Sequence, residues 1–432
     1  MKLSSFFNSQ QIRTSAIGSV AIKFLSALFA LINGILLARM LTVKDFGIYV
    51  LAFTTVTVIT IPVSLGLPHL LTRYISKYEI TKEWGAMKGL LIRSNQFVLI
   101  TSLLAVVIGF ITYVIWWKQY PINTVTTFWY SFLLLPLLVF GALRSAALRG
   151  LKYVVLGQMP ETFLRNMLFT VSLVTVYFSK IELTPQSAML YHIVAAAIAF
   201  FIGYLFLKSK LLNRLKGVEA VFYNKFWLKE ATPFSIISGV QVIKTKSITY
   251  VLAAFGSYEA VAIFDVALRG SALVSFTVEA LNLAISPYIS TAFEQQQTES
   301  LQRIVKKTAR LVFVLSIPIA LVLIFGGEWI IGFLFGSEYI VAYIPVVILC
   351  VGHIINTIVG PLAAVLNMTD NQKYLSKNQM QMMVLSIILS VPFVYFWDVE
   401  GAAVVFSLIL SLQLILLVIF VKRKLKIDPT IF

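Results

Sequence analysis

The chain has few charged residues and almost no cysteine. Only 12% of its 432 residues are charged, which is about half the share that soluble domains carry. Cys350 is the single cysteine, so an intramolecular disulfide is excluded and a cysteine-based metal site is not expected. His69, His192 and His353 are scattered with no ligand spacing, and we expect them to pack in the interior. No metal and no cofactor is therefore expected.

Two features of membrane enzymes are also missing. No GxxxxGK[ST] phosphate loop occurs, so the chain is not expected to use ATP directly. A membrane polysaccharide polymerase or transferase would usually need a sizeable outer loop that carries acids, and the outer gaps of this sequence are short. We therefore expect no enzymatic activity, and a membrane polysaccharide polymerase stays an alternative.

Long apolar runs dominate the sequence. Hydrophobic residues make up 59% of it, and about twelve runs are long enough to cross a membrane as helices. They leave no room for a sizeable soluble domain, so the sequence predicts an all-α membrane protein with twelve transmembrane helices. The runs lie near residues 17–39, 46–71, 89–117, 124–147, 160–178, 185–207, 232–255, 259–289, 309–335, 340–368, 376–397 and 401–421.

Positive charge gathers in every second gap between these runs. Lysine and arginine number 35 against 18 acidic residues, which gives a net charge of +17. Nucleic-acid binding is one interpretation of so basic a chain, but the alternation fits better the rule that cytoplasmic loops are rich in lysine and arginine. It predicts an even number of spans, both termini in the cytoplasm and no nucleic-acid partner. The basic gaps begin with Lys2 and Arg13, and they include Arg149 after the fourth run, with Arg144 near the end of that run. The last basic gap contains Lys422, Arg423, Lys424 and Lys426.

The longest basic gap, residues 208–229, lies near the middle of the chain and is interpreted as a cytoplasmic linker. It separates an N-terminal six-helix lobe, residues 1–207, from a C-terminal six-helix lobe, residues 230–432. Faint internal similarity favours this division, because residues 37–49 align with residues 252–264. Two six-span halves that begin on the same side would be parallel repeats, related by a pseudo-two-fold axis along the membrane normal.

A few charged residues fall inside the apolar runs. A charge at mid-bilayer costs about 2.5–3.5 kcal/mol on insertion scales, so such residues usually face a cavity or a partner. At a rise of about 1.5 Å per residue, four cations fall near the midplane of a core about 30 Å thick. They are Lys23, Lys244, Lys246 and Arg269. Arg93 and Arg165 are shallower, where long side chains can reach the cytoplasmic interface.

Lys23, Arg165, Lys244, Lys246 and Arg269 make up a candidate cationic cavity. Lysine and arginine bind phosphate groups well, so a wet cavity of this kind suits an anionic substrate such as a phosphate or pyrophosphate. On a regular helix, Lys244 and Lys246 point roughly 200° apart. Either their helix is distorted so that both face the cavity, or one lines the cavity while the other pairs or snorkels.

Three acids accompany these cations. Asp265 stands four residues before Arg269, and Glu161 stands four before Arg165, so each acid can form an ion pair on one helix face. Alternatively, such an acid exchanges its cationic partner for a proton or Na⁺ during transport. Glu279 is the third candidate for ion coupling, and its simpler interpretation is an acid at the membrane interface.

Three short stretches resemble one family of membrane transporters. They are residues 41–49 (LTVKDFGIY), residues 147–151 (ALRGL) and residues 335–339 (FGSEY). They look like stretches of the polysaccharide flippases, the Wzx-type O-antigen transporters. The resemblance extends over the whole chain, and it implies membership of the multidrug/oligosaccharidyl-lipid/polysaccharide exporter superfamily, with twelve helices in two six-helix lobes.

The resemblance also implies a function in polysaccharide or lipopolysaccharide biosynthesis. Such a flippase moves an undecaprenyl-diphosphate-linked oligosaccharide from the cytoplasmic to the periplasmic leaflet of the bacterial inner membrane, by alternating access and with ion coupling. The expected partners are the lipid-linked oligosaccharide, membrane lipids, a proton or sodium ion, a polysaccharide polymerase and chain-length proteins. A multidrug exporter of the same superfamily is the alternative, although such exporters usually take cationic drugs and favour acidic cavities.

Overall fold

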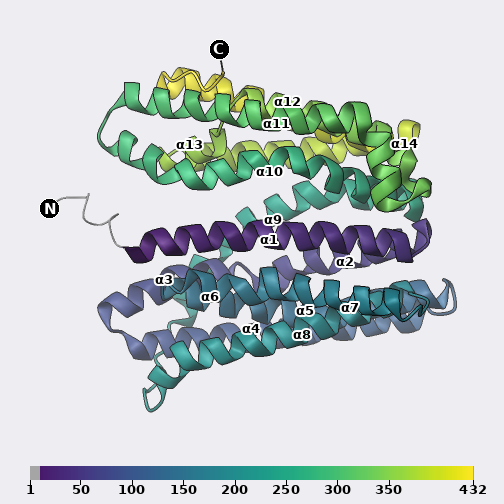
Figure 1. The fold of residues 1–432 in the computed structure, drawn as a ribbon. Coiled ribbons are helices and arrows are strands. Elements are labelled where there is room, and N and C mark those ends of the chain that lie inside the picture. The colour runs from purple at the N-terminus through teal and green to yellow at the C-terminus, as the bar shows by residue number, and fades with distance from the viewer. Residues whose placement is uncertain (1–9, 432) are drawn as a thin grey trace. The chain divides into compact units, whose positions relative to one another are not determined.

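The computed structural model describes residues 10–431, apart from the side chains of residues 10–17, 280, 283, 284 and 287. Lys2 therefore lies outside the described residues. All regular elements of residues 10–431 are helical (Figure 1). In chain order they are α1 (Gln10–Met40), α2 (Val43–Ser64), α3 (Leu67–Thr81), α4 (Trp84–Trp116), α5 (Ile122–Gly150), α6 (Val154–Gln158), the π-helical turn η2 (Met159–Leu164), α7 (Arg165–Phe178), α8 (Pro185–Lys210), η3 (Leu212–Leu215), α9 (Asn224–Phe255), α10 (Tyr258–Glu294), α11 (Thr298–Phe335), η4 (Ser337–Ala342), α12 (Tyr343–Ile358), α13 (Leu362–Met368) and α14 (Gln372–Leu425).

These elements make twelve transmembrane spans within residues 10–431. Among the described residues, nine helical stretches are long and apolar enough to cross a membrane. One of them, α14, is 54 residues long and contains two spans, because its backbone breaks at Asp398. The other two spans are α9 and the broken helix formed by α6, η2 and α7, and both carry charged residues near their middle. The predicted all-α membrane fold with twelve helices is therefore confirmed.

The last two spans follow one another with no loop between them. Asp398, at the break, has φ 44° and ψ −120°. Residues other than glycine rarely adopt this backbone conformation. A Cβ atom on Gly401 would lie 2.0 Å from the carbonyl oxygen of Phe393. Only glycine therefore allows the chain to turn back so closely at this position.

The chain divides into two compact units. Unit 1 contains Met1–Leu41 and Ala52–Gly239, and unit 2 contains Thr42–Leu51 and Val240–Phe432. Two helices thus contribute to both units. The first residues of α2 pack in unit 2, and the first half of α9 packs in unit 1.

Two of the three flippase-like stretches meet inside unit 2. The Phe46 ring packs edge-on against the Tyr339 ring with centroids 6.2 Å apart, and both residues are buried. A Cβ atom on Gly47 would lie 1.8 Å from the carbonyl oxygen of Tyr258. Gly47 therefore lets α2 approach the first residue of α10, so that the family-like pattern at residues 41–49 has a packing role.

The start of α2 is fixed by its own polar residues. The Thr42 hydroxyl accepts a hydrogen bond from the Asp45 backbone N–H (3.2 Å) and donates one to the Asp45 carboxylate (2.9 Å). Threonine followed three residues later by an acid is a typical helix start, because the side chains satisfy and complement free N–H groups. This explains why polar Thr42 and Asp45 precede the buried Phe46.

The basic stretch after α8 packs on unit 1. The backbone N–H of Val221 donates to the carbonyl oxygen of Gly85 at 2.9 Å, and a Cβ atom on Gly89 would lie 1.9 Å from the Val221 carbonyl oxygen. The Trp227 indole then donates to the Tyr78 hydroxyl at 3.0 Å. These contacts hold the first turn of α9 against α3 and α4.

The residues after α14 fold back onto α11. Asp428 and Gln302 exchange two hydrogen bonds of 2.7 Å between the Gln302 amide and the Asp428 backbone. The Asp428 carboxylate accepts hydrogen bonds from the Thr430 hydroxyl (2.8 Å) and from Lys422 (3.1 Å). Partial burial raises the pKa of Asp428, but the hydrogen bonds from Thr430 and Lys422 outweigh it, so the pKa lies below its ordinary value.

We predict that Gly47→Ala destabilises the protein. The new methyl group overlaps the Tyr258 carbonyl oxygen, and overpacking of this kind costs about 1–3 kcal/mol. Thermal unfolding of the purified protein in detergent measures the loss. Gly326→Ala is the matched control, because the nearest atom to its Cβ is 3.8 Å away. Equal unfolding temperatures for the two variants would contradict the close approach.

We predict that acid releases the segment after α14. Because the folded pKa of Asp428 is lowered, its charge stabilises the docked segment above the unfolded pKa, and this stabilisation is lost as the pH falls through the folded pKa. Hydrogen exchange of residues 426–431, corrected for intrinsic rates, should show protection that declines below about pH 4. Asp428→Asn should show weak protection at every pH. Protection of the wild type that is independent of pH would refute the prediction.

Candidate functional site

Unit 1 contains a cavity of about 490 Å³ between α1, α2, α5 and the broken helix α6–η2–α7. Its charged lining residues are Lys23 from α1, Arg149 from α5, and Glu161 and Arg165 from the broken helix. Three cations therefore face one acid. The other lining residues are Thr60, Ser64, Leu138, Val139, Ala142, Ser145, Gln158 and Thr162.

Lys23 lies on the polar side of α1. One turn before it, the Ser19 hydroxyl donates to the Gln158 side chain at 2.7 Å. One turn after it, the Ser26 hydroxyl donates to the Thr162 carbonyl oxygen at 2.8 Å. Residues at this spacing share one helix face, so these two hydrogen bonds hold Lys23 toward the broken helix and the cavity.

A buried ion pair forms one wall of this region. Arg144 is 4% exposed, and its guanidinium donates to the Glu161 carboxylate and, at 2.9 Å, to the Phe200 carbonyl oxygen. Two glycines leave room for the pair. A Cβ atom on Gly203 would lie 1.6 Å from the Arg144 guanidinium, and one on Gly141 would lie 2.3 Å from the Glu161 carboxylate.

The π-helical turn η2 presents Glu161 to α5. Pro160 has no N–H to donate and so interrupts the regular hydrogen-bond pattern, and the Arg165 N–H donates to the Pro160 carbonyl oxygen five residues back. Such single π turns are frequent at functional sites. Arg165 remains close enough to Glu161 to interact electrostatically. The pair predicted for Glu161 and Arg165 is thus part of a cluster of three charges with Arg144.

Arg144 and Arg149 are the site residues that the sequence interpretation missed. It counted both only as cations that set the topology and placed Arg149 in the gap after residue 147, which was wrong, because α5 continues to Gly150 and carries both in its last two turns. The Arg149 Nε atom is buried without a hydrogen-bond partner among the described residues. The available signal was the residues before them, since an alanine and a leucine directly precede each arginine and extend the apolar run up to it.

Unit 2 contains a second charged cluster. Lys244 donates a hydrogen bond to the side chain of Gln413. Lys246 interacts electrostatically with Asp265 and Arg269, which form an ion pair of 2.5 Å one turn apart on α10. The two lysines therefore reach different neighbours, as their angular separation on a regular helix requires.

The structure divides the predicted site residues by unit. Unit 1 brings Lys23, Glu161 and Arg165 together, and unit 2 brings Lys246, Asp265 and Arg269 together, with Lys244 on Gln413. Glu279 is exposed and lies ten residues beyond Arg269 on α10, about 15 Å along the helix. Within the described part of the chain, Glu279 forms no ion pair within 4.0 Å.

Two protein families match the sequence. The family described as polysaccharide biosynthesis protein matches residues 13–293, and the MatE family matches residues 233–396. No curated protein matches the chain.

Solved structures of transporters share this fold. An inward-facing multidrug resistance MATE family transporter of the MOP superfamily matches with a TM-score of 0.76 at 13% identity, over 95% of this chain and 98% of that one. A MOP superfamily transporter from Pyrococcus furiosus, described by the reverse polarity of its binding pocket, matches with a TM-score of 0.66 at 12% identity, over 96% and 95%. The MATE multidrug transporter DinF-BH matches with a TM-score of 0.68 at 14% identity, over 98% and 97%.

We predict that replacing Arg144 alone destabilises the protein far more than replacing Arg144 and Glu161 together. Arg144→Met leaves the Glu161 carboxylate buried without its partner, which costs about 3–5 kcal/mol. Arg144→Met with Glu161→Leu removes both charges and should recover much of that loss. Thermal unfolding in detergent measures both variants.

The exposed pair of Arg73 and Glu230 provides the control. Its side chains are 62% and 31% exposed, so Arg73→Met should change stability by less than about 1 kcal/mol. The buried-pair interpretation fails if Arg144→Met is as mild as Arg73→Met.

Proposed function

Because the chain belongs to the polysaccharide biosynthesis protein family within the MOP superfamily of transporters, we propose that it is a flippase for a lipid-linked oligosaccharide. The substrate is an undecaprenyl-diphosphate-linked repeat unit, of an O-antigen or a similar polysaccharide, that moves from the cytoplasmic to the periplasmic leaflet by alternating access. The observation that carries this proposal is the excess of cations in the cavity of unit 1.

The charges of that cavity suit a diphosphate. Arg144 pairs with Glu161, and Lys23, Arg149 and Arg165 add three further cations around the cavity. Intramembrane cations are costly and usually have a functional partner. Arginine donates paired hydrogen bonds to phosphate oxygens, whereas lysine acts as a point charge. The Arg149 Nε atom is buried and has no hydrogen-bond partner among the described residues. A phosphate oxygen can accept the hydrogen bond that this N–H donates.

The charged residues of unit 2 belong to the same proposal. Lys244, Lys246 and Arg269 are proposed to bind the anionic group of the substrate as well. Asp265, Glu161 and Glu279 are proposed to couple transport to a proton or a sodium ion. For Asp265, this means that the ion replaces Arg269, its present partner, at one stage of the cycle.

The cellular setting follows from the same assignment. The chain is a multi-pass membrane protein, and we place it in the bacterial inner membrane with both termini in the cytoplasm, because its basic gaps follow the positive-inside rule. A polysaccharide polymerase and chain-length proteins are the proposed partners. They would act on the repeat unit after it has crossed the membrane.

A multidrug exporter is the second candidate function. The match of residues 233–396 to the MatE family favours it, and its substrates would be organic cations. The excess of positive charge around the cavity of unit 1 opposes such substrates through like-charge repulsion. Drug-resistance measurements on cells that overexpress the chain separate the two functions.

We predict that Lys23→Ala with Arg149→Ala abolishes surface polysaccharide. Each hydrogen bond to a charged group contributes about 1.5–3 kcal/mol, so the double variant should lose transport by roughly a hundredfold or more. The measurement is surface polysaccharide in a deletion strain of the native host that expresses the variant, with membrane protein levels checked by immunoblot.

The controls locate the effect. Lys118→Ala removes an exposed cation outside the cavity and should leave polysaccharide unchanged. Lys244→Ala with Arg269→Ala tests the unit 2 cluster in the same assay. Normal polysaccharide from the Lys23/Arg149 double variant would refute the unit 1 site, and drug resistance conferred by the wild type without any effect on polysaccharide would refute the flippase.

A further inference from the structure

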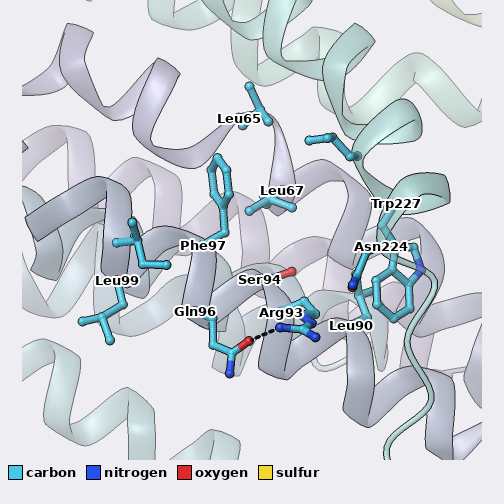
Figure 2. Close-up of a pocket in the computed structure, with 12 residues that line it drawn as sticks. Leu65, Leu67, Leu90, Arg93, Ser94, Gln96, Phe97, Leu99, Asn224 and Trp227 are labelled. Atoms are coloured by element: carbon cyan, nitrogen blue, oxygen red, sulfur yellow. Dashed lines mark hydrogen bonds between the residues drawn. The ribbon is translucent and has the colours of Figure 1, made fainter. Parts of the chain in front are cut away.

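A second cavity of unit 1 opens on an apolar surface. It has a volume of about 610 Å³ and lies between α3, α4 and the first turn of α9, a size within the range of small-molecule sites. Figure 2 shows Arg93 and Gln96 joined by a hydrogen bond near Asn224, with Phe97 and Leu65 toward the other end. We call this cavity the α4 groove, and its lining residues are Leu65, Leu67, Leu90, Arg93, Ser94, Gln96, Phe97, Leu99, Ile100, Asn224, Trp227 and Leu228.

Arg93 gives one end of the α4 groove a positive charge. Its guanidinium donates to the Gln96 side chain at 2.9 Å and lies 4.6 Å from the centre of the Phe222 ring. Within the described part of the chain, no carboxylate lies within 4.0 Å of it. Arg93 is therefore held in place but not neutralised.

The rest of the α4 groove is apolar and open. Leu99, Ile100 and Leu228 are 58%, 60% and 53% exposed. Arg93, Phe97 and Ile100 follow one another at helical spacing, so one face of α4 carries the charge and then the apolar residues in sequence. In a bilayer, hydrocarbon chains fill such a hollow, and the charged end lies where a lipid head group can reach it.

We propose that the α4 groove binds one anionic phospholipid. The phosphodiester accepts hydrogen bonds from Arg93 and Gln96, and one acyl chain lies along Phe97 and Ile100. Basic pockets between transmembrane helices on the positively charged side are suited to anionic head groups. A single guanidinium matches a single phosphodiester, whereas the diphosphate of the proposed substrate matches the three cations of the other cavity. This lipid is therefore a structural ligand, and it is independent of the transported one.

The α4 groove also indicates what the lipid does. Asn224, Trp227 and Leu228 line it from the first turn of α9, while the other lining residues come from α3, α4 and the chain just before α3. A bound lipid would contact both sides and hold the first turn of α9 on unit 1. A ligand that binds only the folded protein stabilises it, so anionic lipid should raise the unfolding temperature.

The test uses the full chain in detergent with dioleoylphosphatidylglycerol as the probe. Native mass spectrometry counts the retained lipid, and thermal unfolding follows the stabilisation. We expect the wild type to retain one tightly held molecule, with dioleoylphosphatidylcholine held at least several-fold more weakly. Arg93→Ala should weaken retention about fivefold, as expected for one cation at a lipid surface, and Arg93→Lys should recover part of it.

Matched variants separate the groove from the general lipid surface. Leu99→Trp places a large ring at the groove and should reduce retention, whereas Leu103→Trp, 61% exposed on the same helix outside the groove, should not. Lys82→Ala removes an exposed cation elsewhere in unit 1 and should also have no effect.

Three outcomes overturn the proposal. The first is equal retention by the wild type, Arg93→Ala and Leu99→Trp. The second is equal retention of the anionic and the zwitterionic lipid. The third is displacement of the phospholipid by another ligand. Displacement by inorganic phosphate alone would assign the groove to free phosphate, and displacement by undecaprenyl phosphate at a lower concentration than the phospholipid would assign it to the lipid of the substrate. The surface-polysaccharide assay separates the α4 groove from the transport site. We expect the Lys23→Ala, Arg149→Ala double variant to lose surface polysaccharide and Arg93→Ala to keep it.

Discussion

The buried ion pair of Arg144 and Glu161 determines how unit 1 is built around its cavity. A charge inside a membrane protein needs a partner, because removing it from water costs several kcal/mol. The pair needs space, which Gly141 and Gly203 provide. It also needs Glu161 to face α5, which the π turn at Pro160 allows. One electrostatic requirement thus explains two glycines and an irregular helix.

Most of the fold could be predicted from hydropathy and charge. The twelve spans follow from the length of the apolar runs, although some helices begin well before the predicted runs: α9 begins at Asn224 rather than 232, and α11 at Thr298 rather than 309. The exceptions have local causes. Arg149 was taken for a loop residue and Arg144 for a cation that only sets the topology, because arginine is rare inside helices that cross a membrane, yet α5 carries both. The π turn could not be predicted, because Pro160 is also compatible with an ordinary helix start.

The site could be predicted only by residue type and depth. Those criteria correctly marked Lys23, Glu161 and Arg165 as charges within the spans, and these three line one cavity. They could not show that Glu161 pairs with a residue 17 positions away, because partners across helices depend on packing that one sequence does not reveal. The pair of Asp265 and Arg269 was predictable, since neighbours one turn apart on a helix meet without help from the rest of the fold.

The turn at Asp398 limits what the protein can present outside the membrane. With the last two spans joined by a backbone break and a glycine that approaches Phe393, almost no chain protrudes there. Proteases and antibodies need several accessible residues in an extended or mobile segment. This end of the chain therefore offers them little to bind, and an epitope inserted there would have to separate two helices rather than lengthen a loop.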